Sequence, residues 1–183
     1  MVMANEGAID GIYAPAIDDR LVMSQALISS RACFYTRKDS KWSYAGPRSL
    51  EGTIVSVIDD YGYDIGAFDE YVAKAKRDNI RTVQLRTGDT AGETNLKMLL
   101  RARFPAMIEH EAVIAYLLKL QGPKAAPQVR NAGCLETPLP LVIGFAKNNP
   151  TTPALIKMVD AGVAKLRSSG RLGQLKKKYG VEK

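Results

Sequence analysis

The chain's only histidine, His110, stands between two glutamates, Glu109 and Glu111, in the stretch AMIEHEAV at 106–113. Imidazole and carboxylate groups bind metals, transfer protons and contact ligands, so the trio raises three chemical hypotheses. It can form a metal site, an acid–base pair or the mouth of a binding cleft. A fourth interpretation gives it no chemistry and describes it as a strand that turns into a helix.

The metal hypothesis has the weakest support in the sequence. One histidine and two glutamates at consecutive positions do not converge on one ion, and no second cluster of ligands is visible. The two cysteines, Cys33 and Cys134, lie far apart in apolar stretches and lack the spacing of a zinc motif. Their pattern leaves a disulfide and two buried free thiols equally open. We therefore expect neither a metal nor a cofactor.

The acid–base hypothesis meets a geometric obstacle. Adjacent residues of a strand point to opposite faces of the sheet, so Glu109 and His110 do not face one cleft if the strand continues through both. We therefore expect no catalytic residues in this trio, and an enzyme remains the alternative.

Composition excludes several classes of protein. The chain has 183 residues, 46% of them hydrophobic and 25% charged, and a net charge of +7. Its basic residues are scattered, and the one dense run, LKKKYG at 175–180, is typical of a solvated helix end. We expect no nucleic-acid partner. No apolar run is long enough to cross a membrane, and the start, MVMANEGAID, lacks a signal-peptide pattern.

The middle of the chain alternates between strand and helix patterns. Strand patterns occur at 53–58, 81–85 and 106–109, and helical patterns at 67–79, 90–104 and 111–121. Thr90 and Glu93 have the spacing of a capping box at the start of the second helix. This order predicts a parallel sheet covered by helices on both faces.

The flanks have a different pattern. Two strands separated by a turn are predicted in 7–40, a long strand follows Pro138, and an amphipathic helix fills 149–170 before a short last helix. We expect the central module, 47–138, to be inserted into an outer domain made of 1–46 and 139–183. Two crossings between two lobes make a hinge, and ligands favour the cleft at such a domain interface.

Several segments, in this order, resemble the bacterial family 3 extracellular solute-binding proteins, the polar amino-acid receptors of ABC importers. The segments are GAIDGIYAPAIDDR (7–20), FYTRKDSKWSYAGPRSLEGTIVSVIDDYGY (34–63), TNLKMLLRARFPAMIEHEAVIAYLL (94–118), LPLVIGFAKNNP (139–150) and GVAKLRSSGRLGQLKKKYG (162–180). The resemblance implies an α/β fold of the periplasmic-binding type II class, with two lobes, parallel or mixed sheets and a two-strand hinge.

The resemblance also implies that lobe one is truncated. Members of the family have a signal peptide and then a strand, a helix and a second strand before the segment at which this sequence starts. Strand edges left without these elements invite pairing with another chain, so we expect a homodimer or a strand-swapped assembly.

A ligand site follows from the same resemblance. Arg20 matches the arginine that binds the ligand's α-carboxylate, which a guanidinium can hold with two parallel hydrogen bonds. Members usually have a glycine at Asp60, whose carboxylate can meet a ligand ammonium or cap the next helix. The expected ligand-binding residues are Arg20, Asp60, Tyr61, Gly62, Tyr63, Thr90 and His110.

His110 marks a departure from the family. Members commonly have an aspartate there, which holds the ligand's α-amino group, and a histidine lacks that fixed negative charge. Either the amine is met elsewhere, at Asp59, Asp60 or Glu111, or the ligand is not an ordinary α-amino acid. A third alternative is that binding in the cleft has been lost.

The resemblance predicts the substrate-binding component of an ABC transporter, or a truncated remnant of one. Its expected ligand is a small polar molecule with a carboxylate, its expected partner is a membrane permease, and its expected location is the periplasm. The alternatives are an enzyme similar to cyclohexadienyl or prephenate dehydratase, and the ligand-sensing domain of a regulator.

Overall fold

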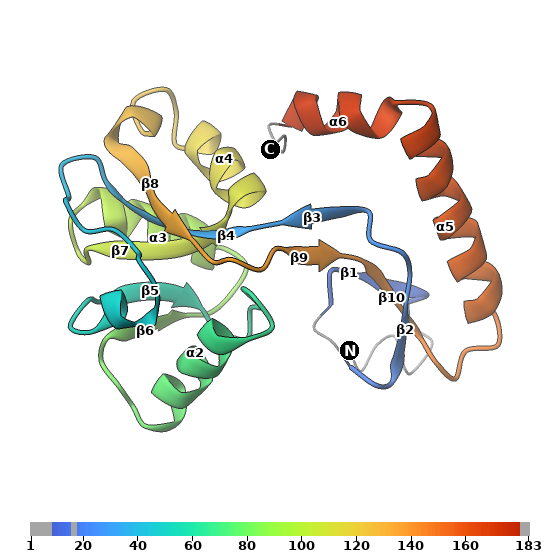
Figure 1. Cartoon of the computed structure of the whole chain (residues 1–183), viewed down its shortest axis with the longest axis horizontal. Helices are drawn as coiled ribbons and strands as arrows, with labels where there is room; N and C mark the ends of the chain where they lie inside the picture. Colours follow the sequence, from blue (N-terminus) through green and yellow to red (C-terminus); the bar gives the residue numbers. More distant parts are fainter. Residues whose placement is uncertain (1–8, 16–17, 180–183) are drawn as a thin grey trace. The chain divides into compact units, whose positions relative to one another are not determined.

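The computed structural model describes residues 9–15 and 18–179, and the chain divides into two compact units (Figure 1). Unit 1 consists of Met1–Ser29 and Pro140–Lys183, and unit 2 of Ser30–Leu139. The chain therefore passes between the units twice. The sequence placed the start of the inserted module at 47. Unit 2 begins earlier because strand β4 (Ala32–Arg37) is hydrogen-bonded between two other strands of that unit.

A five-stranded mixed sheet forms the centre of unit 2, in the order β6-β5-β7-β4-β8. Its other strands are β5 (Val55–Ile58), β6 (Val83–Arg86), β7 (Ala106–His110) and β8 (Val129–Cys134). Strand β5 is parallel to β6 and β7, as the alternating pattern predicts, whereas β4 is antiparallel to both of its neighbours. The carboxyl ends of β5, β6 and β7 therefore lie at one edge of the sheet, called here the rim.

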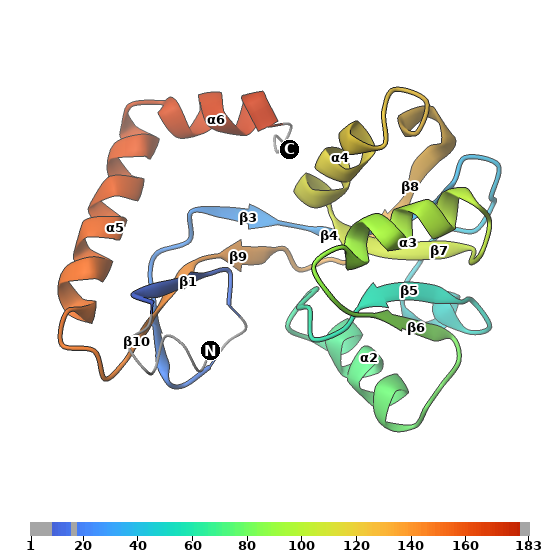
Figure 2. The ribbon, with the colours of Figure 1, turned by 180° about the vertical axis from the view of Figure 1, so that it is seen from behind.

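Helices cover both faces of this sheet (Figure 2). They are α2 (Ala67–Arg77), α3 (Ala91–Leu100) and α4 (Glu111–Leu120), with the short 3-10 turns η1 (Pro47–Leu50) and η2 (Ala126–Gln128). Side chains alternate along β7: Ile108 packs in the cluster that includes Phe68 of α2, and Met107 in the cluster that includes Leu96 of α3. Strands β5 and β7 are thus buried on both faces, which explains their mostly apolar sequences.

Unit 1 contains a three-stranded antiparallel sheet and two helices. The sheet has the order β1-β10-β2, with β1 at Gly11–Tyr13, β10 at Ile143–Ala146 and β2 at Leu21–Met23, and the helices are α5 (Thr152–Ser168) and α6 (Arg171–Tyr179). Strand β3 (Ile28–Ser30) pairs with β9 (Leu139–Leu141) where the chain crosses between the units. The single strand expected after Pro138 is therefore two strands, interrupted at Val142.

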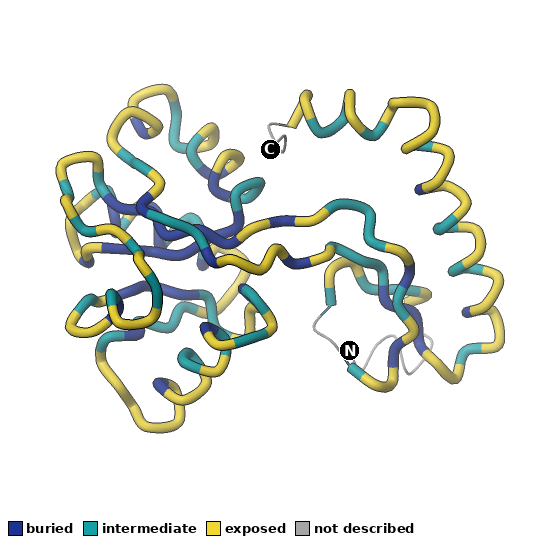
Figure 3. Tube along the Cα trace, in the orientation of Figure 1, coloured by how far each residue is buried: buried dark blue, intermediate teal, exposed yellow. Residues whose placement is uncertain are grey.

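Burial differs between the elements (Figure 3). The strands of unit 2 are largely buried, whereas α5 is mostly exposed, and Thr152 and Val163 are its only buried residues. Among the described residues, no helix combines the length and the apolar character that crossing a bilayer requires.

Candidate functional site

The rim of unit 2 carries most of the residues that the sequence predicts to bind ligand. The turn 59–63 follows β5, the loop 87–90 follows β6, and His110 is the last residue of β7. Because β5, β6 and β7 are parallel, the three segments leave the sheet at the same edge. In open α/β sheets, ligands bind outside this edge.

His110 is buried and both of its ring nitrogens are hydrogen-bonded. Nε2 lies 3.0 Å from the carbonyl oxygen of Gly62, and Nδ1 lies 3.1 Å from the Ser30 hydroxyl. A carbonyl only accepts, so Nε2 carries the proton of the neutral ring and Nδ1 accepts from Ser30. Burial lowers the pKa of His110 below its usual value, which favours this neutral form. The ring thereby ties the turn 59–63 to the end of β7.

Two tyrosines pack around the histidine ring. Tyr63 is fully buried, is stacked on His110 with ring centroids 6.2 Å apart, and accepts a hydrogen bond from the Ile58 N–H at 2.8 Å. Tyr61 meets the rings of Tyr63 and His110 edge-on and is 37% exposed. Tyr63 is therefore a packed core residue, and Tyr61 presents an aromatic ring at the surface of the rim.

Asp60 has the backbone conformation that suits a glycine. Its φ is 56°, in the left-handed region, which aspartate tolerates better than most residues. Its exposed carboxylate lies 3.2 Å from Nζ of Lys76, which also donates to Asp59 at 2.7 Å. The helix-capping role considered for Asp60 belongs instead to Asp64 and Asp69.

These two carboxylates bind the backbone at the start of α2 reciprocally. Asp64 accepts hydrogen bonds from the N–H groups of Gly66, Phe68 and Asp69. Asp69 accepts from the N–H groups of Tyr63 and Ile65 at 2.9 and 2.8 Å. They fix the turn that carries Tyr61 and Gly62, and a sequence search for a single capping residue overlooks such a pair.

Thr90 lies at the start of α3 as predicted, but its side chain forms no capping bond, so the capping-box prediction was wrong. The Thr90 backbone, at φ −104° and ψ 14°, is outside the extended conformation that aims a hydroxyl at the first helical N–H groups. Glu93 is 3.3 Å from Lys97, one helical turn later. The exposed Thr90 hydroxyl thus stands beside an uncapped helix start.

Glu109 is fully buried on the face of β7 opposite to the His110 side chain. Its Oε1 accepts the His110 backbone N–H at 2.8 Å, and its Oε2 is without a hydrogen-bond partner in the described part of the chain. Burial raises the pKa of Glu109 to about 7, against the hydrogen bonds from the His110 backbone and the Tyr61 side chain. The two side chains do not form the acid–base pair considered from the sequence.

Arg20 belongs to unit 1 and lies in the turn before β2. Its Nε donates to the Asp18 carboxylate at 2.8 Å, and its backbone N–H donates to the same group at 2.9 Å. These bonds hold the pKa of Asp18 well below its usual range. The Arg20 guanidinium, which is predicted to bind the ligand's carboxylate, is therefore hydrogen-bonded to the carboxylate of Asp18.

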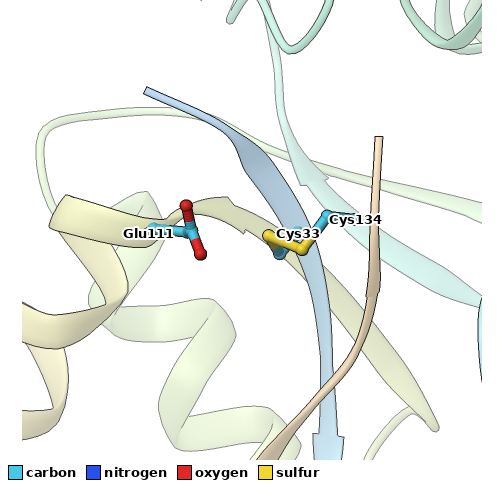
Figure 4. Close-up of side chains that lie close together, drawn as sticks. All are labelled: Cys33, Glu111 and Cys134. Atoms are coloured by element: carbon cyan, nitrogen blue, oxygen red, sulfur yellow. A yellow bond between two sulfur atoms is a disulfide. The ribbon is translucent and has the colours of Figure 1, made fainter. Parts of the chain in front are cut away.

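Cys33 and Cys134 form a disulfide between the adjacent strands β4 and β8, where they lie directly opposite each other (Figure 4). Glu111, the first residue of α4, places a carboxylate oxygen within 4.8 Å of both sulfur atoms. The sequence left the cysteine pairing open because strand register, which decides it, cannot be read from cysteine spacing.

A cavity of about 600 Å³ also opens on unit 2, lined by 44–47, 64–67 and 134–137. Asp64 and Glu136 make its lining acidic, and burial, together with these two charges, raises the pKa of Tyr44. The seven residues predicted to bind ligand are not part of this lining.

Comparison with known proteins identifies the fold. No protein-family model and no curated protein matches the chain. Among solved structures, an ancestral arginine-binding protein bound to arginine is 20% identical, with a TM-score of 0.69 over 97% of this chain and 74% of its own. A histidine kinase sensor domain with similarity to periplasmic binding proteins is 15% identical, with a TM-score of 0.72 over 97% and 72%.

A third similar structure is an ancestral amino-acid-binding protein, AncCDT-1, described as a precursor of cyclohexadienyl dehydratase. It is 16% identical, with a TM-score of 0.67 over 97% of this chain and 72% of its own. The three structures differ in role and share an architecture. The chain therefore has the type II fold of the periplasmic binding proteins, as its sequence motifs predict.

Proposed function

We propose that this protein binds a small polar solute with a carboxylate, either an amino acid or a related acid, and delivers it to the permease of an ABC transporter. The observation that carries the proposal is the fold, which an arginine-binding protein shares over 97% of this chain. The resemblance of the sequence motifs to solute-binding proteins supports the same function.

The rim of unit 2 offers suitable groups for such a ligand. The first turn of α3 has backbone N–H groups without intrahelical acceptors, and such groups receive carboxylates. The exposed Thr90 hydroxyl and the partly exposed Tyr61 ring stand at the same edge. We propose that Thr90, Tyr61 and Gly62 contact the ligand, and that Tyr63 and His110 act by holding the turn in place.

The charged groups at the rim favour a carboxylic acid without an amino group over an ordinary α-amino acid. Asp59 and Asp60 are paired with Lys76, and Glu109 is buried. His110 is neutral, so it does not replace the aspartate that would hold an ammonium group. We propose that Asp60 contacts the ligand only after its carboxylate leaves Lys76. We propose that Arg20 of unit 1 binds the ligand's carboxylate in place of the carboxylate of Asp18.

Isothermal titration calorimetry tests this function. The ligands are L-arginine, a pool of the other amino acids, and a pool of small carboxylic acids without an amino group. We expect saturable binding, strongest for the carboxylic acids, and an at least tenfold weaker affinity in Tyr61→Ala, because stacking area is lost. Tyr116→Ala, which removes a 61% exposed ring on α4, is the matched control and should bind normally. Absence of binding to every pool would refute the proposal.

One observation favours an enzyme as the second candidate. Glu109, with a pKa of about 7, can hold or release a proton near neutral pH, which suits a general acid. AncCDT-1, similar in fold, is described as a precursor of a dehydratase. Turnover of prephenate that is lost in Glu109→Gln and kept in Glu70→Gln would establish this candidate, and no turnover by the parent protein would reject it.

The same ligand binding would serve a sensor domain, because a histidine kinase sensor shares the fold.

We propose the periplasm as the location, and the disulfide supports an oxidising compartment.

We further propose a homodimer or strand-swapped assembly. Unit 1 has edge strands β1 and β2, and helix α5 exposes Met158 by 70%. Light scattering coupled to size-exclusion chromatography should give twice the chain mass. A well-folded monomer would contradict this assembly.

A further inference from the structure

Three side chains with potential metal-ligand atoms converge at a place distinct from the proposed rim contacts. The Sγ atoms of Cys33 and Cys134 and a carboxylate oxygen of Glu111 all lie within 4.8 Å of one another (Figure 4). They come from three different elements: β4, β8 and the first residue of α4. Sulfur and carboxylate oxygen are both ligands of zinc.

Backbone hydrogen bonds fix the positions of these groups. Cys33 is paired with Cys134 on one side and with Glu109 on the other, so it lies in the interior of the sheet. The Glu111 N–H donates to the Arg31 carbonyl at 3.0 Å, which holds the start of α4 beside β4. The three donors therefore stay close together independently of the bond between the sulfur atoms.

The carboxylate of Glu111 is half-buried and, among the described residues, forms no hydrogen bond or ion pair. A partly buried carboxylate is satisfied by water, by protein donors or by a cation. Its neighbours are two sulfur atoms, which supply no positive charge in any state. A cation bound to all three groups would satisfy the carboxylate.

Reduction changes what the sulfur atoms can bind. A dithiol reductant transfers two electrons and two protons to the disulfide and is itself converted to a cyclic disulfide, leaving two thiols. Binding of a divalent ion then displaces the two thiol protons, so two thiolates and one carboxylate surround the ion. The amino end of α4, ten residues long, favours these negative charges.

We propose that Cys33, Cys134 and Glu111 form a binding site for Zn²⁺ or a similar thiophilic divalent ion, which the disulfide masks and reduction exposes. Asn131 donates from Nδ2 to the Cys134 sulfur at 3.3 Å and so orients that ligand from outside the site. Cys134 is also among the residues that line the 600 Å³ cavity. A water molecule or a solute fills the fourth position.

Zinc titration of the whole chain in two redox states tests the proposal. The reduced protein is prepared with dithiothreitol, which is then removed under anaerobic conditions, and Zn²⁺ is titrated in competition with a chromophoric chelator. We expect one ion per reduced chain and none per oxidised chain. With Co²⁺ in place of Zn²⁺, the reduced protein should show sulfur-to-metal charge-transfer absorption in the near ultraviolet.

Glu111→Gln is the decisive variant, because it keeps both cysteines and hence the disulfide used in folding. Its affinity for Zn²⁺ in the reduced state should fall about tenfold or more, as a ligand is replaced by a weaker one. Glu136→Gln, in the lining of the same cavity, is the matched control and should bind as the parent does. Circular dichroism verifies that the reduced proteins stay folded.

Three results would overturn the proposal. They are a folded reduced protein that binds no ion, equal affinities of the parent and Glu111→Gln, and loss of the folded state on reduction, since the site needs the sheet.

Discussion

At the scale of single residues, His110 is a connector and not an isolated reactive group. It joins β7 to Gly62 and Ser30 through its two ring nitrogens and is stacked on Tyr63. The sequence predicts its place at the end of a strand on the rim. It does not predict the two hydrogen bonds, because Gly62 and Ser30 reach the ring only through tertiary folding.

His110→Ala should destabilise unit 2 by about 2–4 kcal/mol, since it leaves the Gly62 carbonyl and the buried Ser30 hydroxyl without their partner and removes ring packing. Urea unfolding followed by circular dichroism measures the loss. Tyr116→Ala, at an exposed position on α4, serves as the control and should change stability by less than about 0.5 kcal/mol. Unchanged stability of His110→Ala would contradict the connecting role.

Glu109 makes the stability of the protein depend on pH. Its pKa is raised from 4.5 in the unfolded chain to about 7 in the folded protein, mainly by burial. The contribution of Glu109 to the free energy of unfolding is therefore fully present below pH 4.5. It is lost as the pH rises through 7, by about 3 kcal/mol in total. Glu109→Gln cannot ionise, so it should be more stable than the parent at pH 8 and lose this advantage at pH 5.

Urea unfolding of both proteins at pH 5 and pH 8 checks this expectation. His110 contributes with the opposite sign, because its lowered pKa costs stability as the pH falls below 6.5. The difference between Glu109→Gln and the parent isolates Glu109, because His110 is present in both. Glu70→Gln, at an exposed position of α2, should show no such pH-dependent difference.

At the scale of elements, the regular parts of unit 2 follow from the sequence. Strands β5, β6 and β7 and helices α2, α3 and α4 lie where apolar periodicity predicts them, because local pattern and burial agree there. The antiparallel strand β4 was not anticipated within this sheet. Its partners β7 and β8 are distant in sequence, so its membership depends on long-range pairing that periodicity does not encode.

Capping was the less predictable part of these helices. Thr90 has the right residue type and spacing yet makes no cap, while Asp64 and Asp69 share the start of α2. A cap depends on the backbone dihedral angles of the preceding residue, and these are set by the turn that leads into the helix.

Strand β8 depends on a glycine. Gly133 has a φ of 121°, and a Cβ atom there would lie 2.6 Å from the Tyr44 carbonyl oxygen. Gly133→Ala should therefore lower stability by about 3 kcal/mol, through backbone strain and displacement of the segment at Tyr44. Gly173→Ala on α6 meets no atom within 4 Å and should be neutral or slightly stabilising, so it is the control in thermal unfolding. Equal effects of the two variants would refute this role.

At the scale of the whole molecule, the chain divides into two units and passes between them twice. The sequence predicts an inserted module as well, with bounds at 47 and 138. The ligand contacts at the rim remain a proposal, because strand ends locate a binding edge without selecting a ligand. The disulfide, by contrast, is a feature of unit 2 alone, since both cysteines lie within Ser30–Leu139.

Reduction of the disulfide should lower the stability of unit 2 by about 2–5 kcal/mol, because the unfolded chain regains the freedom of a long loop. Hydrogen exchange followed by mass spectrometry should show faster exchange at β5 and β7 in the reduced protein. Cys134→Ser should behave like the reduced parent, and Ser169→Ala, at an exposed site in unit 1, like the oxidised one. Equal exchange in both redox states would contradict this expectation.

The bond between Cys33 and Cys134 also changes what a cut in the chain can do. It closes a covalent ring around nearly all of unit 2, and on that ring the end of α2, with Lys76 and Arg77, and the turn that follows it are exposed. Trypsin that cleaves only in this segment would open the ring without releasing a fragment. The nicked protein should run as one band of full mass on a non-reducing gel and as two bands once the thiols are freed.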